Sequence, residues 1–212
     1  MTQILKIDYH NPEPELIARA GRIITGAGVI AYPTETVYGI GCSAFITEAV
    51  NRVYSLKNRD QSKAMILIAA DPIQISEMVE TIPEAAEILM DEFWPGPLTL
   101  VFEVSPRLGE FAFRRSKTIA IRIPDCAICL ALLKNCGFPI VSTSANKSGQ
   151  PEATTAEQVI ETFGDSVDAI LDGGETPSKS PSTVVDITRT PPRILREGAI
   201  SALEINTVLK IL

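Results

Sequence analysis

Short apolar runs alternate with segments of helical periodicity along most of the 212-residue chain. Residues 64–70 are continuously apolar, which is typical of a strand buried on both faces of a sheet. Residues 16–24 instead repeat apolar side chains at the spacing of one helix face. Further strands are predicted at residues 28–32, 98–104, 118–123, 139–142, 169–171 and 183–187, and further helices at residues 49–56, 85–92, 126–136, 155–163 and 203–212. The alternation predicts an α/β fold, with a mixed, twisted sheet and flanking helices, in a single domain over residues 1–212.

The acidic composition and the single histidine exclude several classes of protein. There are 19 Lys and Arg residues against 26 Asp and Glu residues, so the net charge is −7. A chain this acidic lacks the basic surface of proteins that bind duplex nucleic acid over their whole surface. His10 is the only histidine, which excludes a multi-histidine metal site and a conventional Ser-His-Asp relay. Catalysis is therefore expected to use other groups.

The cysteines and the N-terminus predict a cytoplasmic protein that is not associated with a membrane. Four cysteines in a chain of this length do not form a disulfide framework. Cys126 and Cys129 have redox or zinc spacing, but they lie in the apolar run 126–133 and no second such pair follows, so core packing is expected. Residues 1–10 lack the apolar stretch of a signal peptide, and no apolar segment is long enough to span a membrane.

Polar clusters follow the predicted strands, where an α/β sheet usually places its ligand. The sequence PTETVYG at residues 33–39, with Thr36, is either a plain turn or part of a site. Lys57, Arg59 and Lys63 either complement a helix dipole or bind a polyphosphate. The chain has no GxxxxGK[ST] loop, so phosphate recognition would need such cationic side chains.

Three further features of the sequence add hydrogen-bond donors and one positive charge that would be costly to bury. Residues 142–149 carry four hydroxyls and an amide, more than a turn requires, and favour an anion or nucleotide site through Ser142, Ser144 and Asn146. Arg122 lies inside an apolar strand, so it must pair with a carboxylate of the protein or of a ligand. The clusters at 181–186 and 196–198 are weak signals alone, and residues 173–181 form a mobile loop or a lid.

Seven motifs occur in a characteristic order: PTETVYGIGC, KNR with a following lysine, FWPGPLTLVF, RIP, VSTSANKSG, STVVD and REGAI. In this series, which runs from about residue 24 to about residue 200, the chain resembles the YrdC-domain family of threonylcarbamoyl-adenylate synthases, in their short, single-domain form. The resemblance implies that L-threonine, bicarbonate and ATP are condensed to threonylcarbamoyl-adenylate and pyrophosphate. Downstream proteins then use this product to modify an adenosine in tRNA.

The resemblance also implies a role for each matching residue. Lys57 and Arg59 correspond to the family's KxR motif and are the expected catalytic pair. The nucleotide and its phosphates are expected to contact Arg59, Lys63, Ser144, Asn146 and Arg196. L-Threonine is expected to contact Thr36, Arg122, Ser142 and Ser182, with Arg122 pairing its carboxylate. Mg²⁺ is expected on the polyphosphate of ATP, without a metal site made by the protein.

The sequence departs from the family pattern at Asp60, Glu197 and Ile68; one branch of the family has a histidine at the last position. Ile68 leaves the exact threonine contacts open. The sequence also does not separate an active synthase from an inactive paralogue. A non-catalytic RNA-binding module is the alternative function, although acidity and few aromatic residues make direct tRNA binding weak. Carbamoyl-phosphate-using relatives are a third possibility, but those chains are larger and carry zinc-finger-like cysteines. We expect Lys57→Ala and Arg59→Ala to abolish activity without unfolding the protein.

Overall fold

The computed structural model describes residues 1–61, 63–106 and 117–209. Its strands form one sheet in the order β1-β8-β2-β3-β7-β4-β6-β5-β9-β10. The strands are β1 (Gln3–Lys6), β2 (Ile30–Tyr32), β3 (Gly39–Ser43), β4 (Ile66–Ile68), β5 (Leu98–Glu103), β6 (Thr118–Arg122), β7 (Ile140–Ser144), β8 (Ala169–Asp172), β9 (Thr183–Asp186) and β10 (Arg193–Arg196). The helices are α1 (Pro14–Thr25), α2 (Thr47–Lys57), α3 (Pro72–Ser76), α4 (Glu84–Phe93), α5 (Ala127–Cys136), α6 (Ala156–Phe163) and α7 (Ala202–Leu209), with a 3₁₀ turn η1 (Gly164–Ser166) after α6.

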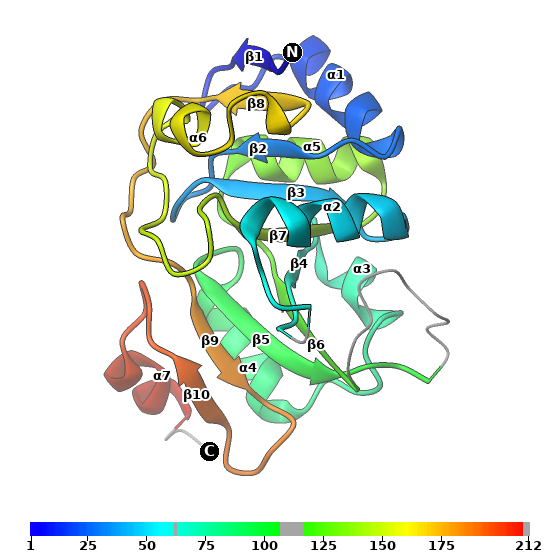
Figure 1. The fold of residues 1–212 in the computed structure, drawn as a ribbon. Coiled ribbons are helices and arrows are strands. Elements are labelled where there is room, and N and C mark those ends of the chain that lie inside the picture. Colours follow the sequence, from blue (N-terminus) through cyan, green and yellow to red (C-terminus); the bar gives the residue numbers. More distant parts are fainter. Residues whose placement is uncertain (62, 107–116, 210–212) are drawn as a thin grey trace.

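The sheet mixes parallel and antiparallel neighbours, which confirms the predicted α/β class. The strand β8 runs parallel to β1 and β2, whereas β3 and β7 are antiparallel to each other. In Figure 1 the strands β1, β8, β2 and β3 run across the view, while β5, β6, β9 and β10 run steeply, so the sheet is strongly twisted. Twist of this kind gives the sheet a concave side on which residues distant in sequence come together.

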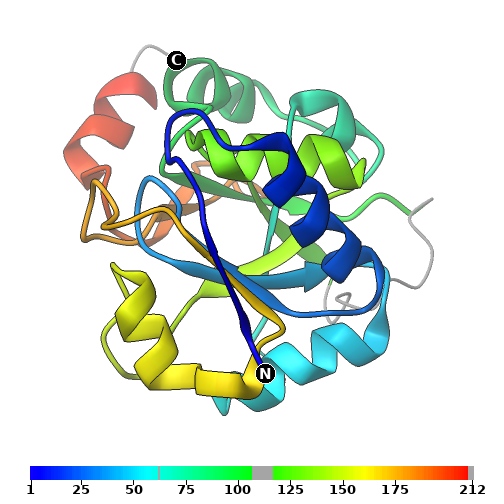
Figure 2. The same ribbon diagram turned by 90° about the horizontal axis from the view of Figure 1, so that it is seen from above.

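Helices cover both faces of the upper half of the sheet. Figure 2 shows α1 and α5 on one face and α2 and α6 on the other. The apolar stripe predicted at residues 16–24 is the buried face of α1, because Ile17, Ala20 and Ile24 are all at most 4% exposed. They pack in one core cluster with Cys126 and Cys129, which confirms that these cysteines are buried core residues.

Some elements differ from the sequence prediction. The strands β1, β3 and β10 and the short helix α3 were not expected, and the strand predicted over residues 64–70 is confined to Ile66–Ile68. The helix predicted over 203–212 is α7, and residues 210–212 of that prediction lie outside the described residues. Among the described residues, no helix combines the length and apolarity needed to cross a bilayer.

The register of the central strands decides which side chains share a face. Ile66 of β4 lies opposite Ser142 of β7, and Ile68 lies opposite Arg122 of β6. Because directly opposed residues point to the same side of a sheet and residues two apart do so too, Ser142 and Arg122 project from one face. The sheet therefore brings a hydroxyl and a guanidinium that are 20 positions apart to the same concave surface.

Candidate functional site

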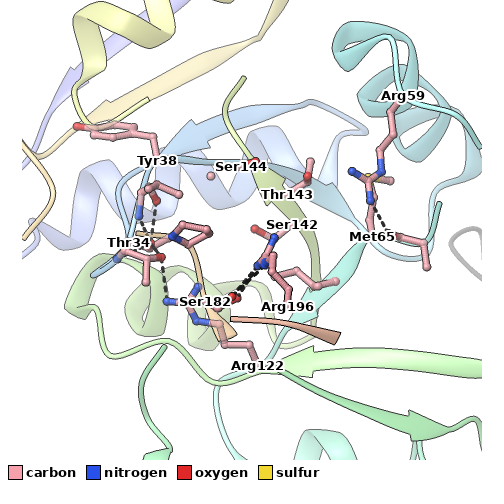
Figure 3. Close-up of a pocket in the computed structure, with 16 residues that line it drawn as sticks. Thr34, Tyr38, Arg59, Met65, Arg122, Ser142, Thr143, Ser144, Ser182 and Arg196 are labelled. Carbon is pink, nitrogen blue, oxygen red and sulfur yellow. Dashed lines mark hydrogen bonds between the residues drawn. The ribbon is translucent and has the colours of Figure 1, made fainter. Parts of the chain in front are cut away.

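One hollow on the concave side of the sheet gathers most of the polar residues singled out from the sequence (Figure 3). Its volume is about 120 Å³, which is small compared with the pockets that hold drug-sized ligands. Seven of the ten predicted site residues line it: Thr36, Arg59, Arg122, Ser142, Ser144, Ser182 and Arg196. We call the part made by Thr36, Arg122, Ser142 and Ser182 the inner end, and the part made by Arg59, Ser144 and Arg196 the outer end.

The inner end is formed by buried side chains. Thr36, Arg122, Ser142 and Ser182 are between 1% and 4% exposed. Thr36 comes from the turn after β2, Ser142 from β7, and Ser182 from the residue before β9. Four polar residues this deep are tolerated only where each finds a hydrogen-bond partner.

Arg122 meets a carboxylate of the protein. One Nη2 atom lies 2.6 Å from Oε1 of Glu35, and both side chains are largely buried. The same Nη2 atom donates to Oγ1 of Thr36 at 3.1 Å, and Nε donates to the carbonyl of Gly96 at 3.1 Å. The sequence left open whether Arg122 pairs with a carboxylate of the protein or of a ligand, and the structure shows a pair with the protein's own Glu35. Arg122 nevertheless borders the hollow.

Glu35 joins three segments around the inner end. Besides its ion pair with Arg122, Oε1 accepts the backbone N–H of Asp125 at 3.0 Å, and the Glu35 carbonyl accepts the N–H of Ser178 at 3.2 Å. Its second carboxylate oxygen, Oε2, is buried and has no hydrogen-bond partner among the described residues. The sequence offered no signal for this residue beyond its place in the PTETVYG turn.

The outer end has more solvent access and carries two unneutralised cations. Nη2 of Arg59 donates to the carbonyl of Ala64 at 2.8 Å, and Nη2 of Arg196 donates to the carbonyl of Ser182 at 2.7 Å. Within the described residues, neither guanidinium lies within ion-pair distance of a carboxylate. Burial lowers the pKa of Arg196, but a guanidinium remains charged at neutral pH.

The end of α2 explains how Arg59 reaches the outer end. Asn58 takes the left-handed conformation with φ of 51°, which asparagine adopts more readily than most residues. The N–H of Arg59 then bonds to the carbonyl of Tyr54 at 3.0 Å, which closes the last turn. The chain leaves the helix at this point and directs Arg59 toward the residues that precede β4.

Lys57 lies beneath the outer end and is not part of its lining. It is 1% exposed, and its ammonium donates to the carbonyl and Oδ1 of Asn146, at 2.7 and 2.8 Å, and to the carbonyl of Ser144. Oδ1 of Asn146 also accepts the Ser144 hydroxyl at 2.7 Å. Lys57 therefore holds the turn after β7. The side chain is buried and not exposed as expected, so its substitution should lower the stability of the fold.

Burial also changes the acidity of Lys57. It lowers the pKa of the ammonium to about 7, and the charge of Arg59 acts in the same direction. The acceptor oxygens around Nζ favour the protonated form and oppose this shift. Lys63 is exposed and lies outside the lining of the hollow, as does the largely buried Asn146.

The loop 173–181 is anchored at several points. The hydroxyl of Tyr38 donates to the carbonyl of Gly174 at 2.8 Å, and Thr176 is 3% exposed. The segment after β10 approaches this loop closely at Gly198. Only a glycine allows this approach, because a Cβ at residue 198 would lie 2.2 Å from the carbonyl oxygen of Pro181. The N–H of Gly198 donates to Oγ1 of Thr183 at 2.9 Å. The clusters at 181–186 and 196–198, weak alone in the sequence, therefore form one unit.

The arrangement suits binding and charge stabilisation better than covalent catalysis. The lining of the hollow contains no cysteine or histidine, and its hydroxyls contact other hydroxyls, backbone groups and arginines. The described residues contain no group of three His, Cys, Asp or Glu side chains that could hold a metal ion. Two unneutralised guanidiniums beside a buried polar recess can hold an anionic ligand next to a small polar one.

Comparisons with known proteins identify the family of this chain. A family model for the Sua5, YciO and YrdC proteins, described as "Telomere recombination", matches residues 22–198. A protein of Pyrococcus abyssi named threonylcarbamoyl-AMP synthase is 39% identical over 209 residues, covering 99% of this chain and 61% of the relative. A Bacillus subtilis protein of the same name is 39% identical over 194 residues, covering 91% of this chain and 56% of the relative. The chain thus spans about three fifths of the length of these two relatives.

A solved structure shows the same fold. The crystal structure of P. abyssi Sua5 complexed with L-threonine has a TM-score of 0.93 and 38% sequence identity, and the match covers 98% of this chain and 61% of that one. The family model alone covers most of the chain, and the fold and motif order agree with it. The chain belongs to the Sua5/YciO/YrdC family.

Proposed function

We propose that this chain synthesises L-threonylcarbamoyladenylate from L-threonine, bicarbonate and ATP, with release of pyrophosphate. The relatives from P. abyssi and B. subtilis are named threonylcarbamoyl-AMP synthase, and the P. abyssi structure is described as complexed with L-threonine. The observation that carries the proposal is the hollow itself, where two guanidiniums adjoin a buried recess of hydroxyls and neither lies within ion-pair distance of a described carboxylate. In a chain of net charge −7, this local positive excess indicates an anionic ligand.

The reaction needs positioning and charge stabilisation rather than a protein nucleophile. The amine of threonine captures carbon dioxide derived from bicarbonate, and a carbamate oxygen then attacks the α-phosphorus of ATP. The bond between the α-phosphorus and its bridging oxygen breaks, and pyrophosphate leaves. Such transfers are accelerated by holding the reacting groups in line and by stabilising charge on the phosphoryl oxygens.

We assign the outer end to the triphosphate and the inner end to threonine. Neither Arg59 nor Arg196 lies within ion-pair distance of a carboxylate of the described residues, so each can bind phosphoryl oxygens. Arg122 is already paired with Glu35 at 2.6 Å, so it would offer a ligand carboxylate only the donors that this pair leaves. Lys57 would act indirectly by holding Ser144 and Asn146, while the exposed Lys63 stays a candidate phosphate contact.

The remaining participants follow from the reaction. The donor groups of the hollow are mostly cationic or hydroxylic and do not form a metal cage, so we place Mg²⁺ on the phosphates of ATP. The product is a reactive mixed anhydride, which downstream tRNA-modifying proteins would consume. Direct tRNA binding is not needed for this step, and the acidic chain does not favour it.

The test is detection of the product. Purified protein with L-threonine, bicarbonate and Mg-ATP should yield threonylcarbamoyl-adenylate by mass spectrometry, with pyrophosphate released only when all substrates are present. Arg59→Ala should lower this release by a factor of about 10 to 100, because a charge-assisted contact to phosphate is lost. Arg22→Ala, an exposed arginine of α1, is the matched control and should behave as the wild type.

Two results would contradict the proposal. One is a wild-type protein that makes no product but binds tRNA in a salt-sensitive manner, which would favour the RNA-binding alternative. The other is full activity of Arg59→Ala, which would remove the outer end from the site.

A further inference from the structure

Three hydroxyls of the inner end each contact a second buried hydroxyl. Tyr32 Oη lies 2.8 Å from Ser142 Oγ, Thr34 Oγ1 lies 2.7 Å from Thr36 Oγ1, and Thr99 Oγ1 lies 2.8 Å from Ser182 Oγ. Tyr32 and Thr99 are fully buried and do not border the hollow, whereas Thr34 is 5% exposed and borders it. A hydroxyl has one proton, so a buried partner decides whether the front hydroxyl offers a proton or a lone pair to the hollow.

For the pair of Tyr32 and Ser142 the direction is set by burial. Tyr32 is fully buried, and its proton has one acceptor among the described residues, Ser142 Oγ. Burial raises the pKa of Tyr32, so the phenol keeps that proton at physiological pH. An unpaired buried O–H is costly, so Tyr32 must donate and Ser142 must accept. The proton of Ser142 is then free to point into the hollow.

The pair of Thr34 and Thr36 has no such fixed direction. Thr34 Oγ1 donates its proton to the carbonyl of Val37 at 2.8 Å and accepts the N–H groups of Thr36 and Val37 at 3.0 and 3.2 Å. The Thr36 oxygen accepts from Arg122 at 3.1 Å. The pair of Tyr32 and Ser142 is therefore the one in which burial alone sets the direction of the hydrogen bond.

Two glycines make the pair of Tyr32 and Ser142 possible. Gly39 and Gly41 of β3 lie under the tyrosine ring, because a Cβ at Gly39 would be 3.1 Å from Tyr32 Cε2 and 3.2 Å from Ser142 Oγ. A Cβ at Gly41 would lie 2.7 Å from Tyr32 Oη. The Tyr32 side chain therefore extends from β2 across the glycines of β3 to reach Ser142 on β7.

We propose that Tyr32 is a positioning residue, which fixes the Ser142 hydroxyl as a hydrogen-bond donor to an oxygen atom of the bound amino acid. Tyr32 does not border the hollow and acts through Ser142. The inference rests on the proposed function, since it assigns the inner end to L-threonine. The inference specifies the direction of one hydrogen bond: the Ser142 hydroxyl donates its proton to an oxygen atom of the ligand.

The test is a double-mutant cycle on threonine binding and turnover. Tyr32→Phe keeps the ring and removes the proton, so it should raise the KM and calorimetric Kd for L-threonine about tenfold, the scale of one hydrogen bond. The kcat should change by no more than about twofold, because the lost contact orients the ligand in the ground state and transition state alike. Ser142→Ala should raise KM at least as much.

The double variant separates positioning from a general structural effect. If Tyr32 acts through Ser142, Tyr32→Phe adds nothing in the Ser142→Ala background. Tyr9→Phe is the matched control, because the Tyr9 hydroxyl is buried, lies away from the lining, and has no hydrogen-bond partner among the described residues. It should leave the KM for threonine unchanged, and thermal unfolding should show that all variants fold.

Each failure has its own signature. A wild-type KM in Tyr32→Phe, or effects of the two substitutions that multiply, would overturn the positioning role while the wild type still makes product. A wild-type protein that neither binds threonine nor makes product would overturn the proposed function and this inference with it.

Discussion

The arginine side chains at the two ends of the hollow are placed in different surroundings. At the inner end the charge of Arg122 is balanced by Glu35, and the polar side chains are at most 4% exposed. Among the described residues, Arg59 and Arg196 at the outer end donate to backbone carbonyls and hydroxyls, and solvent reaches them. The inner end thus balances its cation within the protein, whereas neither cation of the outer end lies within ion-pair distance of a described carboxylate.

The largest effect is expected where a balanced pair is broken. Arg122→Ala leaves the Glu35 carboxylate buried without its cation, so the free energy of unfolding should fall by about 3 kcal/mol and threonine binding should be lost. Denaturant unfolding and calorimetry measure the two effects. The double variant Arg122→Ala with Glu35→Ala should regain part of the stability but none of the binding. Equal stability of the single and double variants would show that the pair is not a buried one.

A smaller effect, with a characteristic pH dependence, is expected beneath the outer end. Lys57→Met leaves the acceptors of Ser144 and Asn146 unsatisfied and should cost about 2 kcal/mol. The pKa of Lys57 is about 7 in the folded protein, below its ordinary value of 10.5, so above pH 7 the unfolded chain binds more protons than the folded one. Stability conferred by this group therefore rises with pH between these two values.

The measurement is the difference in unfolding free energy between wild type and Lys57→Met at pH 6 and pH 9. It should shift in favour of the wild type at the higher pH. A difference that stays constant would mean that the acceptor oxygens keep the ammonium protonated throughout, and that the base of the outer end is a permanent third cation.

The smallest effect is expected for an ion pair outside the hollow. Lys179 and Glu175 lie 3.2 Å apart with side chains 74% and 57% exposed. Lys179→Ala should change the free energy of unfolding by less than about 0.5 kcal/mol, because solvent screens such pairs. A loss comparable with that of Arg122→Ala would contradict the distinction between buried and exposed pairs on which the contrast of the two ends depends.

Local patterns predicted much of the fold. Mainly apolar runs located β5, β7 and β8. The capping residue Thr155, whose side chain accepts the N–H of Gln158, located the start of α6. The strand β3 was missed because its glycines have low strand propensity. It forms by antiparallel pairing with β2 and β7 on either side. The edge strand β10 was not predicted because it is largely exposed and its sequence lacks alternating apolar residues.

The sequence indicated residues of the candidate site but not the contacts between them. Seven of the ten residues selected from the motifs line one hollow. The sequence could not show that Lys57 is buried under the site, because a cation at a helix end is ordinarily solvated. Nor could it choose Glu35 as the partner of Arg122, since that pairing spans 87 positions and depends on the packing of the turn after β2 against β6.

The hydrogen bonds that join Ser182 and Thr183 to the segment around residue 198 have a consequence for biosynthesis. Arg196 donates to the carbonyl of Ser182, and Oγ1 of Thr183 accepts the N–H groups of Gly198 and Ile200. A polypeptide that stops before residue 196 would lack Arg196 and the contacts that Gly198 and Ile200 make with Thr183. The hollow is therefore complete only after these residues have been synthesised. Under the proposed function, a product terminated before residue 196 should be inactive.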